Sequence, residues 1–439
     1  MLHLKNKSLI SNLFIKLLSS SIIANNSQNF FLFFSKKFSK KTMPKTLLKP
    51  TGSYLVGHID MEFTNPNGID ENSTILTRVF YPSNLENSSS NLELTEKNFD
   101  TWIPSMSYFG GYGKSFRLPP FISIPGMRLL VGDLRLNSSY GLPILDNQNL
   151  PVVIFSHGLW GNRTTYSILC TEFASRGWIV FSVEHHDGSA SHSFVKGVPF
   201  DHIRFEKNQN EFEVRNKQLE HRTGECLGLV EILKKLNSGE PVVNFLNDLS
   251  HQEKIKQIPS DFLKSKLNFD CAIIVGHSFG GATAIRASQF TDLFKCAIAY
   301  DPWIVPIEES LLEAPKRSIP TLISNSPDFH KQKSTELIIN YLKLMDSANQ
   351  TANDNTAKRF ISYKIKDIKH DYYSDIPSVL PKMPFSSLPE HYRVIKIILQ
   401  STFEFLADCE LVSIEESKQE KILNFNAQTY PDLIVQYPQ

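Results

Sequence analysis

The sequence predicts an α/β fold in which a mostly parallel, doubly wound sheet carries helices on both faces. Short apolar, β-branched runs alternate with helical segments from residue 150 onward, and several of these runs end in polar residues. Strands that alternate with helices through short connections form parallel sheets with right-handed crossovers. Polar residues at the carboxyl ends of such strands mark the edge where open α/β sheets place their functional groups.

Composition excludes several classes of function. The chain has 439 residues, of which 41% are hydrophobic, enough for a large core. Its 46 basic and 45 acidic residues give a net charge of +1, so no overall field attracts nucleic acid. The five cysteines are widely spaced and include no Cys-x-x-Cys pair, which predicts buried thiols. We therefore expect no nucleic-acid partner, no metal, no cofactor and a reducing compartment.

The N-terminal residues differ from the rest of the chain. Residues 1–59 contain no Asp or Glu but nine lysines. This composition resembles an organellar transit peptide, although Lys stands where Arg is usual. A secretory signal would use Leu9 to Ala24, which Lys16 interrupts, and a disordered tail is the third interpretation. We expect residues 1–47 to be a targeting or disordered leader and favour an intracellular, cytoplasmic or organellar protein over a secreted one.

The catalytic domain is expected at 48–412, followed by a C-terminal tail at 413–439. Tyr54 to Phe63 and Thr74 to Tyr81 predict an antiparallel pair, separated by Asn-Pro-Asn-Gly. Residues 102–136 mix Gly, Pro and aromatics without periodicity, which leaves a lid, a lipid-facing lip or plain packing open. The later strands are expected at 150–156, 178–183, 273–275, 296–300, 321–324 and, last, 360–365, with helices at 164–176, 211–236, 282–287, 334–345 and 390–407.

The central motif is Gly276-His-Ser-Phe-Gly280, placed between an apolar strand and small, helix-forming residues. Gly-x-Ser-x-Gly in this context predicts a nucleophile elbow, in which a sharp turn lifts Ser278 clear of the sheet. A phosphate-binding loop is the rival interpretation, but Ala282 occupies the position that would require lysine. The amide of Phe279, at the start of the following helix, is expected to stabilise negative charge on a substrate oxygen.

Two further strand ends complete a candidate triad. Asp301 follows the strand at 296–300, and His370 lies beyond the strand at 360–365. The order Ser, Asp, His is that of α/β-hydrolases, in which the histidine is the base and the acid orients it. From the pattern alone, Asp328 is a rival acid. His330 and His391 are rival bases.

The second oxyanion donor is expected in the loop after the strand at 150–156. That strand ends in His157-Gly158-Leu159, and glycine at this place lets the backbone approach the reacting group closely. We assign the donor to the amide of Leu159. His157 is expected to shape the turn rather than act as a base.

Several segments together resemble a known family. They are Phe155-Ser-His-Gly-Leu, Arg163-Thr-Thr-Tyr-Ser, Val183-Glu-His-His-Asp-Gly-Ser, Gly276-His-Ser-Phe-Gly-Gly-Ala-Thr and Ala299-Tyr-Asp-Pro-Trp. Over about residues 48–408 the chain is similar to the platelet-activating factor acetylhydrolases of the plasma and intracellular type II group. The resemblance implies an α/β-hydrolase with Ser278 as nucleophile, Asp301 as acid, His370 as base, and Leu159 and Phe279 as oxyanion donors.

The same resemblance implies a calcium-independent serine esterase. Its expected substrate is the sn-2 acetyl, short or oxidised acyl ester of a glycerophospholipid, met at a membrane or micelle surface. Fold and triad do not fix the acyl group, so a general carboxylesterase or thioesterase is an alternative. An inactive lipid-binding protein is an alternative of another class. The sequence does not indicate an oligomeric state.

Overall fold

The structure is a computed structural model, and it describes most of the chain between Thr46 and Val412 together with one segment near the C-terminus. The described residues are 46–69, 73–84, 99–115, 117–146, 149–203, 205, 208–248, 257–307, 318–329, 332–351, 360–380, 388–412 and 433–437. The expected leader at 1–47 therefore lies almost wholly outside the described residues.

In this part of the chain a ten-stranded sheet has the order β12-β11-β10-β9-β8-β4-β5-β2-β1-β3. The six strands from β5 to β11 along this order are parallel to one another, as predicted. The ranges are β1 (Leu55–Thr64), β2 (Thr74–Ser83), β3 (Ser139–Tyr140), β4 (Leu150–Ser156), β5 (Ile179–Glu184), β8 (Leu267–His277), β9 (Cys296–Tyr300), β10 (Thr321–Asn325), β11 (Phe360–Ile365) and β12 (Leu433–Tyr437). The expected opening hairpin is β1 and β2, which pair antiparallel.

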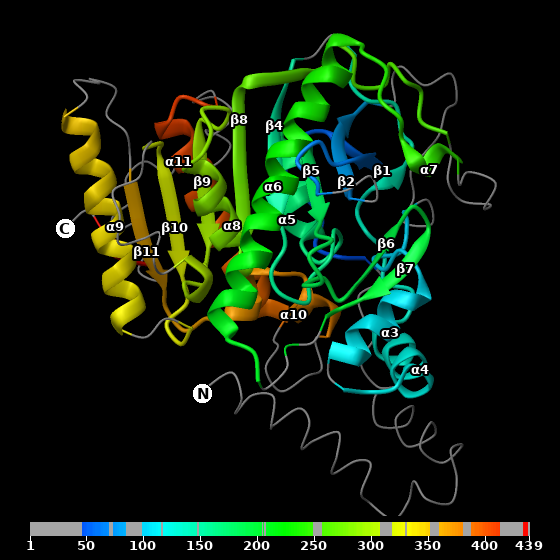
Figure 1. The fold of residues 1–439 in the computed structure, drawn as a ribbon, viewed down its shortest axis with the longest axis horizontal. Helices are drawn as coiled ribbons and strands as arrows, with labels where there is room; N and C mark the ends of the chain where they lie inside the picture. The colour runs from blue at the N-terminus through cyan, green and yellow to red at the C-terminus, as the bar shows by residue number, and fades with distance from the viewer. Residues whose placement is uncertain are drawn as a thin grey trace, which may run out of the picture.

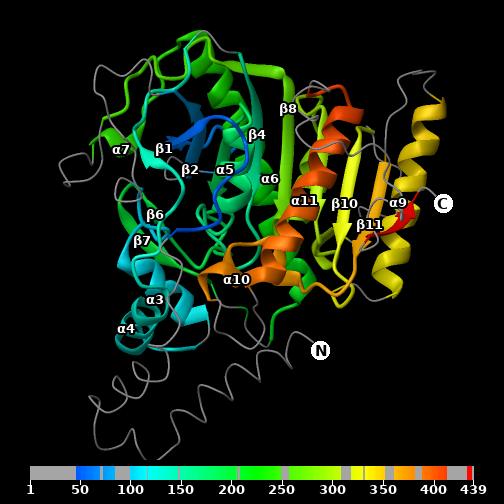
Figure 2. The ribbon, with the colours of Figure 1, turned by 180° about the vertical axis from the view of Figure 1, so that it is seen from behind.

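Helices cover both faces of the sheet. One face carries α6 (Glu211–Ser238), α8 (Phe279–Ser288) and α9 (Gln332–Thr351), which Figure 1 shows on the near side. The other face carries α5 (Ser167–Ser175) and α11 (Leu388–Asp408). Figure 2 views the molecule from this side and shows α11 in front of the strands. Along β4, Val153 and Phe155 belong to one buried cluster, whereas Val152 and Ile154 belong to the other. A strand with apolar residues on both faces requires both to be covered.

Residues 102–136 are partly helical, although their sequence shows no periodicity. They contain α3 (Met106–Ser115) and α4 (Pro120–Val131), which lie beyond the carboxyl ends of the parallel strands (Figure 1). Glycines in α3 obscure its helical pattern, but two of them allow close packing. A Cβ at Gly111 would lie 2.5 Å from the carbonyl oxygen of Ser191, and one at Gly113 would lie 2.0 Å from the Cβ of Ser123.

The sequence predicts that the strand at Phe360–Ile365 is the last one, and the structure shows that this prediction is wrong. β12 pairs antiparallel with β11 beyond it, so the segment taken as a C-terminal tail contributes a strand to the sheet. Outside the main sheet, β6 (His192–Val195) and β7 (Val198–Asp201) form a hairpin that contacts α3. The remaining short helices are α7 (Phe245–Asp248), η3 (Val305–Ile307), η5 (His370–Tyr373) and α10 (Ile376–Val379).

None of the described helices combines the length and the apolar character that crossing a bilayer requires.

Candidate active site

Ser278 lies on the turn between β8 and α8 with φ of 58° and ψ of −118°. Positive φ is unfavourable for a residue with a Cβ, so neighbouring contacts must hold this conformation. The amide of Ser278 donates to the carbonyl of Tyr300 at 2.9 Å, and the amide of Trp303 donates to the carbonyl of Ser278 at 2.8 Å. The strained turn is thus fastened to β9 and to the loop after it.

The two glycines of the motif are required by contacts between backbones. A Cβ at Gly276 would lie 2.1 Å from the carbonyl oxygen of Gly280, and one at Gly280 would lie 1.9 Å from that of Ser156. Both distances are far below a van der Waals contact, and backbone cannot yield as a flexible side chain can. The elbow predicted from Gly-x-Ser-x-Gly is therefore present, for the steric reason that the motif implies.

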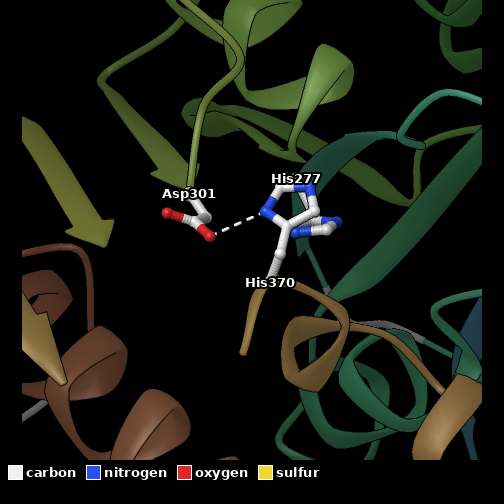
Figure 3. A group of neighbouring side chains, drawn as sticks. All are labelled: His277, Asp301 and His370. Atoms are coloured by element: carbon white, nitrogen blue, oxygen red, sulfur yellow. Dashed lines mark hydrogen bonds and ion pairs between the residues drawn. The ribbon is translucent and has the colours of Figure 1, made fainter. Parts of the chain in front are cut away.

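The three predicted triad residues are brought together. The Nε2 atom of His370 lies 2.9 Å from the Oγ of Ser278, and its Nδ1 lies 2.7 Å from Oδ2 of Asp301. With the proton on Nδ1, His370 donates to the carboxylate and accepts from the serine hydroxyl. Figure 3 shows the imidazole of His370 turned toward Asp301. The Asp301 side chain is fully buried, whereas that of His370 is 20% exposed.

Asp301 is held by the neighbouring strand as well. Its Oδ1 accepts from the amide of Ser326 at 2.9 Å, and its Oδ2 accepts from the hydroxyl of Ser326 at 2.5 Å. The amide of Asp301 donates to the carbonyl of Ser324 at 2.6 Å. Hydrogen bonds to a carboxylate favour its charged form. The loop after β10 thereby fixes the orientation of the acid.

The rival triad residues lie elsewhere or outside the described chain. His391 is buried in α11, where its ring nitrogens pair with the Ser378 hydroxyl at 2.8 Å and the carbonyl of Tyr372 at 3.2 Å. Asp328 lies in the turn after β10, while the two ring nitrogens of His370 are occupied by Ser278 and Asp301. His330 lies outside the described residues.

Phe329 contacts the triad and was missed in the sequence. Its ring is stacked on that of His370, with centroids 3.6 Å apart and planes at 15°. It follows β10 in a turn, where a single phenylalanine carries no motif. The flat contact limits how far the imidazole can rotate.

The two segments predicted to supply the oxyanion donors lie beside Ser278. Phe279 is the first residue of α8, so its amide has no acceptor one turn earlier in that helix. In the loop that carries Leu159, a Cβ at Gly158 would lie 3.1 Å from the Cβ of Ser278. The amide of Gly158 donates to the hydroxyl of Tyr166 at 3.0 Å. The loop is thus close to the nucleophile, as an oxyanion role requires, and that role stays a prediction.

His157 shapes this loop, as expected. It is fully buried, and burial holds its pKa well below the usual value, so the ring is neutral. Its Nδ1 donates to the carbonyl of Gly158 at 2.8 Å, and its Nε2 accepts from the amide of His185 at 3.1 Å. Both ring nitrogens are therefore used to hold backbone.

Arg222 connects the two oxyanion segments, and the sequence did not reveal it. Its Nη1 donates to the carbonyl of His157 at 2.7 Å, and its guanidinium lies 4.2 Å from the ring centroid of Phe279. The side chain is fully buried and pairs with Asp187 at 3.0 Å. One cation thus fixes the loop after β4 relative to the start of α8.

A second buried acid supports the same region. Glu225 accepts from Nδ1 of His185 at 2.6 Å and from the amide of His186 at 2.9 Å. Nε2 of His185 in turn pairs with the hydroxyl of Ser156 at 2.7 Å. Burial alone would raise the pKa of Glu225, but hydrogen bonds from His185 and His221 hold it well below its usual range. Glu225 is therefore charged, and through His185 it holds Ser156 at the end of β4.

The pair formed by His221 and Glu225 predicts a pH-dependent contribution to stability. The hydrogen bond to Glu225, at 3.2 Å, is the main cause that raises the pKa of His221 to about 9. A histidine with a raised pKa stabilises the fold fully below its unfolded value and loses this effect as the pH rises through its folded value. Since the side chain is 34% exposed, we expect His221→Gln to lower the free energy of unfolding by about 1 kcal/mol at pH 6.

This difference should disappear near pH 10. Urea unfolding of both proteins at the two pH values measures it. An equal loss at pH 6 and pH 10 would assign the effect of the substitution to packing rather than to charge.

One group of side chains could in principle hold a metal ion. Among the described residues, His277, Asp301 and His370 place one donor atom each within 4.8 Å of one another (Figure 3). Hydrogen bonds already use most of these donors, since Nδ1 of His277 pairs with the hydroxyl of Tyr166 at 2.8 Å and Asp301 binds His370. Asp301 and His370 are thus explained as members of the triad, and His277 as a neighbouring residue that is hydrogen-bonded to Tyr166.

Comparisons with known proteins place the chain in a family. The family described as platelet-activating factor acetylhydrolase, isoform II, matches residues 37–420. The chain belongs to this family. Platelet-activating factor acetylhydrolases of Bos taurus and Cavia porcellus are 33% and 32% identical over 59% and 67% of the chain. A putative phospholipase A2 of Schizosaccharomyces pombe is 26% identical over 80% of the chain and 88% of its own length.

The chain spans 56% of the bovine relative and 63% of the guinea-pig relative. A solved structure, the ferulic acid esterase of Streptomyces cinnamoneus, matches 89% of this chain and 99% of its own with a TM-score of 0.56 and 15% identity. At this identity the likeness concerns the fold, and it confirms the predicted α/β-hydrolase architecture.

Proposed function

We propose that the protein is a serine esterase that hydrolyses the sn-2 acetyl, short or oxidised acyl ester of platelet-activating factor and related glycerophospholipids. The observation that carries the proposal is the hydrogen-bonded chain from Ser278 through His370 to Asp301 at a strained elbow. The family to which the chain belongs supports the choice of substrate.

The chain's own residues account for each step of hydrolysis. Nε2 of His370 takes the proton of Ser278 as Oγ attacks the ester carbonyl, and Asp301 stabilises the imidazolium. The amides of Leu159 and Phe279 donate to the oxyanion. His370 then returns the proton to the sn-2 oxygen of the leaving lysolipid, and water repeats the sequence on the acyl-serine. No step requires calcium.

Release of the carboxylic acid from three different esters tests this proposal. The substrates are an sn-2 acetyl ether phosphocholine, a long-chain diacyl phosphocholine and a nitrophenyl ester, each assayed with a metal chelator. We expect rapid turnover of the acetyl lipid and little of the long-chain lipid. Turnover of the nitrophenyl ester alone would instead support a general carboxylesterase or thioesterase. No turnover of any ester would leave an inactive lipid-binding protein.

We further propose that α3 and α4 meet the lipid surface. Phe121 of α4 is 78% exposed, and Leu129 and Met106 are more than 40% exposed. The helices that carry these residues lie beyond the carboxyl ends of the parallel strands (Figure 1). Ser278 follows the carboxyl end of β8 at the same edge. Exposed apolar residues on a surface helix favour insertion at the boundary between head groups and acyl chains.

Phe121→Asp is therefore expected to lower the rate on vesicles by about tenfold, because a charge replaces a buried apolar contact with lipid. Turnover of a nitrophenyl ester below any micellar concentration should stay within about twofold, since Phe121 does not touch the triad. The ratio of the two rates is the measurement. Parallel loss on both substrates would show that α4 supports the fold rather than lipid docking.

We also propose an intracellular location. Cys170, Cys226 and Cys296 are buried free thiols. Free thiols persist in reducing compartments, which supports a cytoplasmic or organellar protein.

A further inference from the structure

Arg215, on the second turn of α6, is a buried cation that forms no ion pair with any carboxylate of the described residues. The residue is only 5% exposed to solvent. Nη1 donates to Oε1 of Gln218 at 2.7 Å, but Nε is buried and has no hydrogen-bond partner in the part of the chain that the structure describes. Burial lowers the pKa of Arg215 from its usual value. A buried guanidinium that lacks an anion costs free energy, which a bound anion would recover.

The nearby acids do not fill this role. Glu211 on the same helix and Asp187 both act on Arg215 through their charges. Within the described residues, neither carboxylate lies within 4.0 Å of the guanidinium, and Asp187 is already paired with Arg222 at 3.0 Å. The positive charge of Arg215 is therefore available to a ligand.

Arg215 lies beside residues that hold the nucleophile. Its guanidinium carbon lies 5.6 Å from the ring centroid of Trp303. The amide of Trp303 donates to the carbonyl of Ser278, and its ring packs edge-on against Phe279 with centroids 5.4 Å apart. Asn216, the next residue of α6, donates to the carbonyl of Pro306 at 3.1 Å. The start of α6 is thus fastened to the segment that follows Asp301.

The oxyanion loop borders the same place. Burial is the main cause that lowers the pKa of His202 to about 4, and the charge of Arg215 is the next. The neutral ring of His202 accepts from Nε1 of Trp160 at 3.0 Å, and Trp160 directly follows Leu159. Arg215 is therefore close to both segments that flank Ser278.

We propose that Arg215 binds the phosphate of the substrate's phosphodiester head group. This inference rests on the proposed function, because it assumes a glycerophospholipid. In that substrate only the glycerol carbons separate the sn-2 ester from the phosphate, so an anion-binding group must lie near the nucleophile. Arginine suits this task, since its planar fork donates to two phosphate oxygens at once.

Two substrates with the same ester separate phosphate binding from catalysis. They are 1-alkyl-2-acetylglycerophosphocholine and 1-alkyl-2-acetylglycerol, which lacks the phosphate. We expect Arg215→Gln to lower the ratio of their kcat/KM values by about 10- to 100-fold, mainly through KM, since hydrogen bonds to charged groups are among the strong ones. Arg215→Lys should recover part of the loss. An unchanged ratio, or an equal loss on both lipids, overturns the proposal.

Lys217→Gln is the matched control. Lys217 lies two residues along the same helix and is exposed, so the change removes the same charge from the same region. We expect its ratio of kcat/KM values to equal that of the unmodified protein. A drop as large as that of Arg215→Gln would assign the effect to general attraction and contradict the proposal.

Failure of the proposed function is recognised separately. If the unmodified protein hydrolyses nitrophenyl acetate but no acetyl lipid, inorganic phosphate becomes the probe. Inhibition of nitrophenyl acetate hydrolysis that is lost in Arg215→Gln and kept in Lys217→Gln would support an anion site at Arg215. Inhibition that is absent, or equal in the three proteins, would overturn it.

Discussion

Replacing Ser278 with alanine is expected to lower kcat by about 10⁶-fold, because no other group can form the acyl intermediate. The hydroxyl lies 2.9 Å from Nε2 of His370, the atom that takes its proton. The fold should be unaffected, since the strained turn is held by the backbone bonds to Tyr300 and Trp303 rather than by the hydroxyl. Alanine has the same Cβ as serine, so the turn can keep its φ of 58° without a new contact.

Acetate release and a circular dichroism spectrum on the same preparation measure both parts of this expectation. Full activity in a folded Ser278→Ala protein would remove Ser278 from the mechanism. A matched control is Ser326→Ala, which loses a hydroxyl at Asp301 but keeps the nucleophile. Its rate should remain well above that of Ser278→Ala.

The second large effect is expected for Asp301→Asn, with a loss of about 10⁴-fold in kcat. The amide is similar in shape to the carboxylate, so the amide of Ser326 can still donate to its oxygen. Its NH₂ group would face Nδ1 of His370, which favours the tautomer with the proton on Nε2. With a proton on Nε2, His370 can no longer accept the proton of the Ser278 hydroxyl and cannot act as the general base.

Asp328→Asn provides the comparison, since this rival acid lies in the next turn. We expect its rate to stay within about threefold of the unmodified protein, because Asp328 makes no hydrogen bond to His370. A loss as large as that of Asp301→Asn would contradict the assignment of the acid. Single-turnover kinetics would show whether the loss lies in acylation.

The elbow and the strand order could be predicted because local sequence determines them. Gly276 is required by its contact with the backbone of Gly280, and Gly280 by its contact with the backbone at the end of β4. The placement of Asp301 and His370 followed from the rule that parallel strands end at one edge. The elbow depends on contacts between neighbouring residues, and the parallel sheet has few possible strand connections.

The features that were missed depend on contacts between distant segments. Glycine has a low helix propensity, so the sequence of α3 does not predict a helix. Gly111 instead allows the helix to pack closely against the backbone of Ser191. Arg222 lies on an amphipathic helix where a charged residue predicts exposure, yet Asp187 and the carbonyl of His157 make its burial tolerable. Phe329 has no sequence signal at all, because its role arises only from the position of His370.

β12 has a consequence for how the protein behaves at high concentration. Without it, β11 would be the edge of the sheet and would present a row of unpaired backbone groups along Phe360–Ile365, a largely apolar segment. Such edges recruit strands from other molecules. Since β11 leads toward the loop of His370, a foreign strand there would also disturb the site. Residues 433–437 therefore place one further strand between β11, which leads to the catalytic histidine, and the open edge of the sheet.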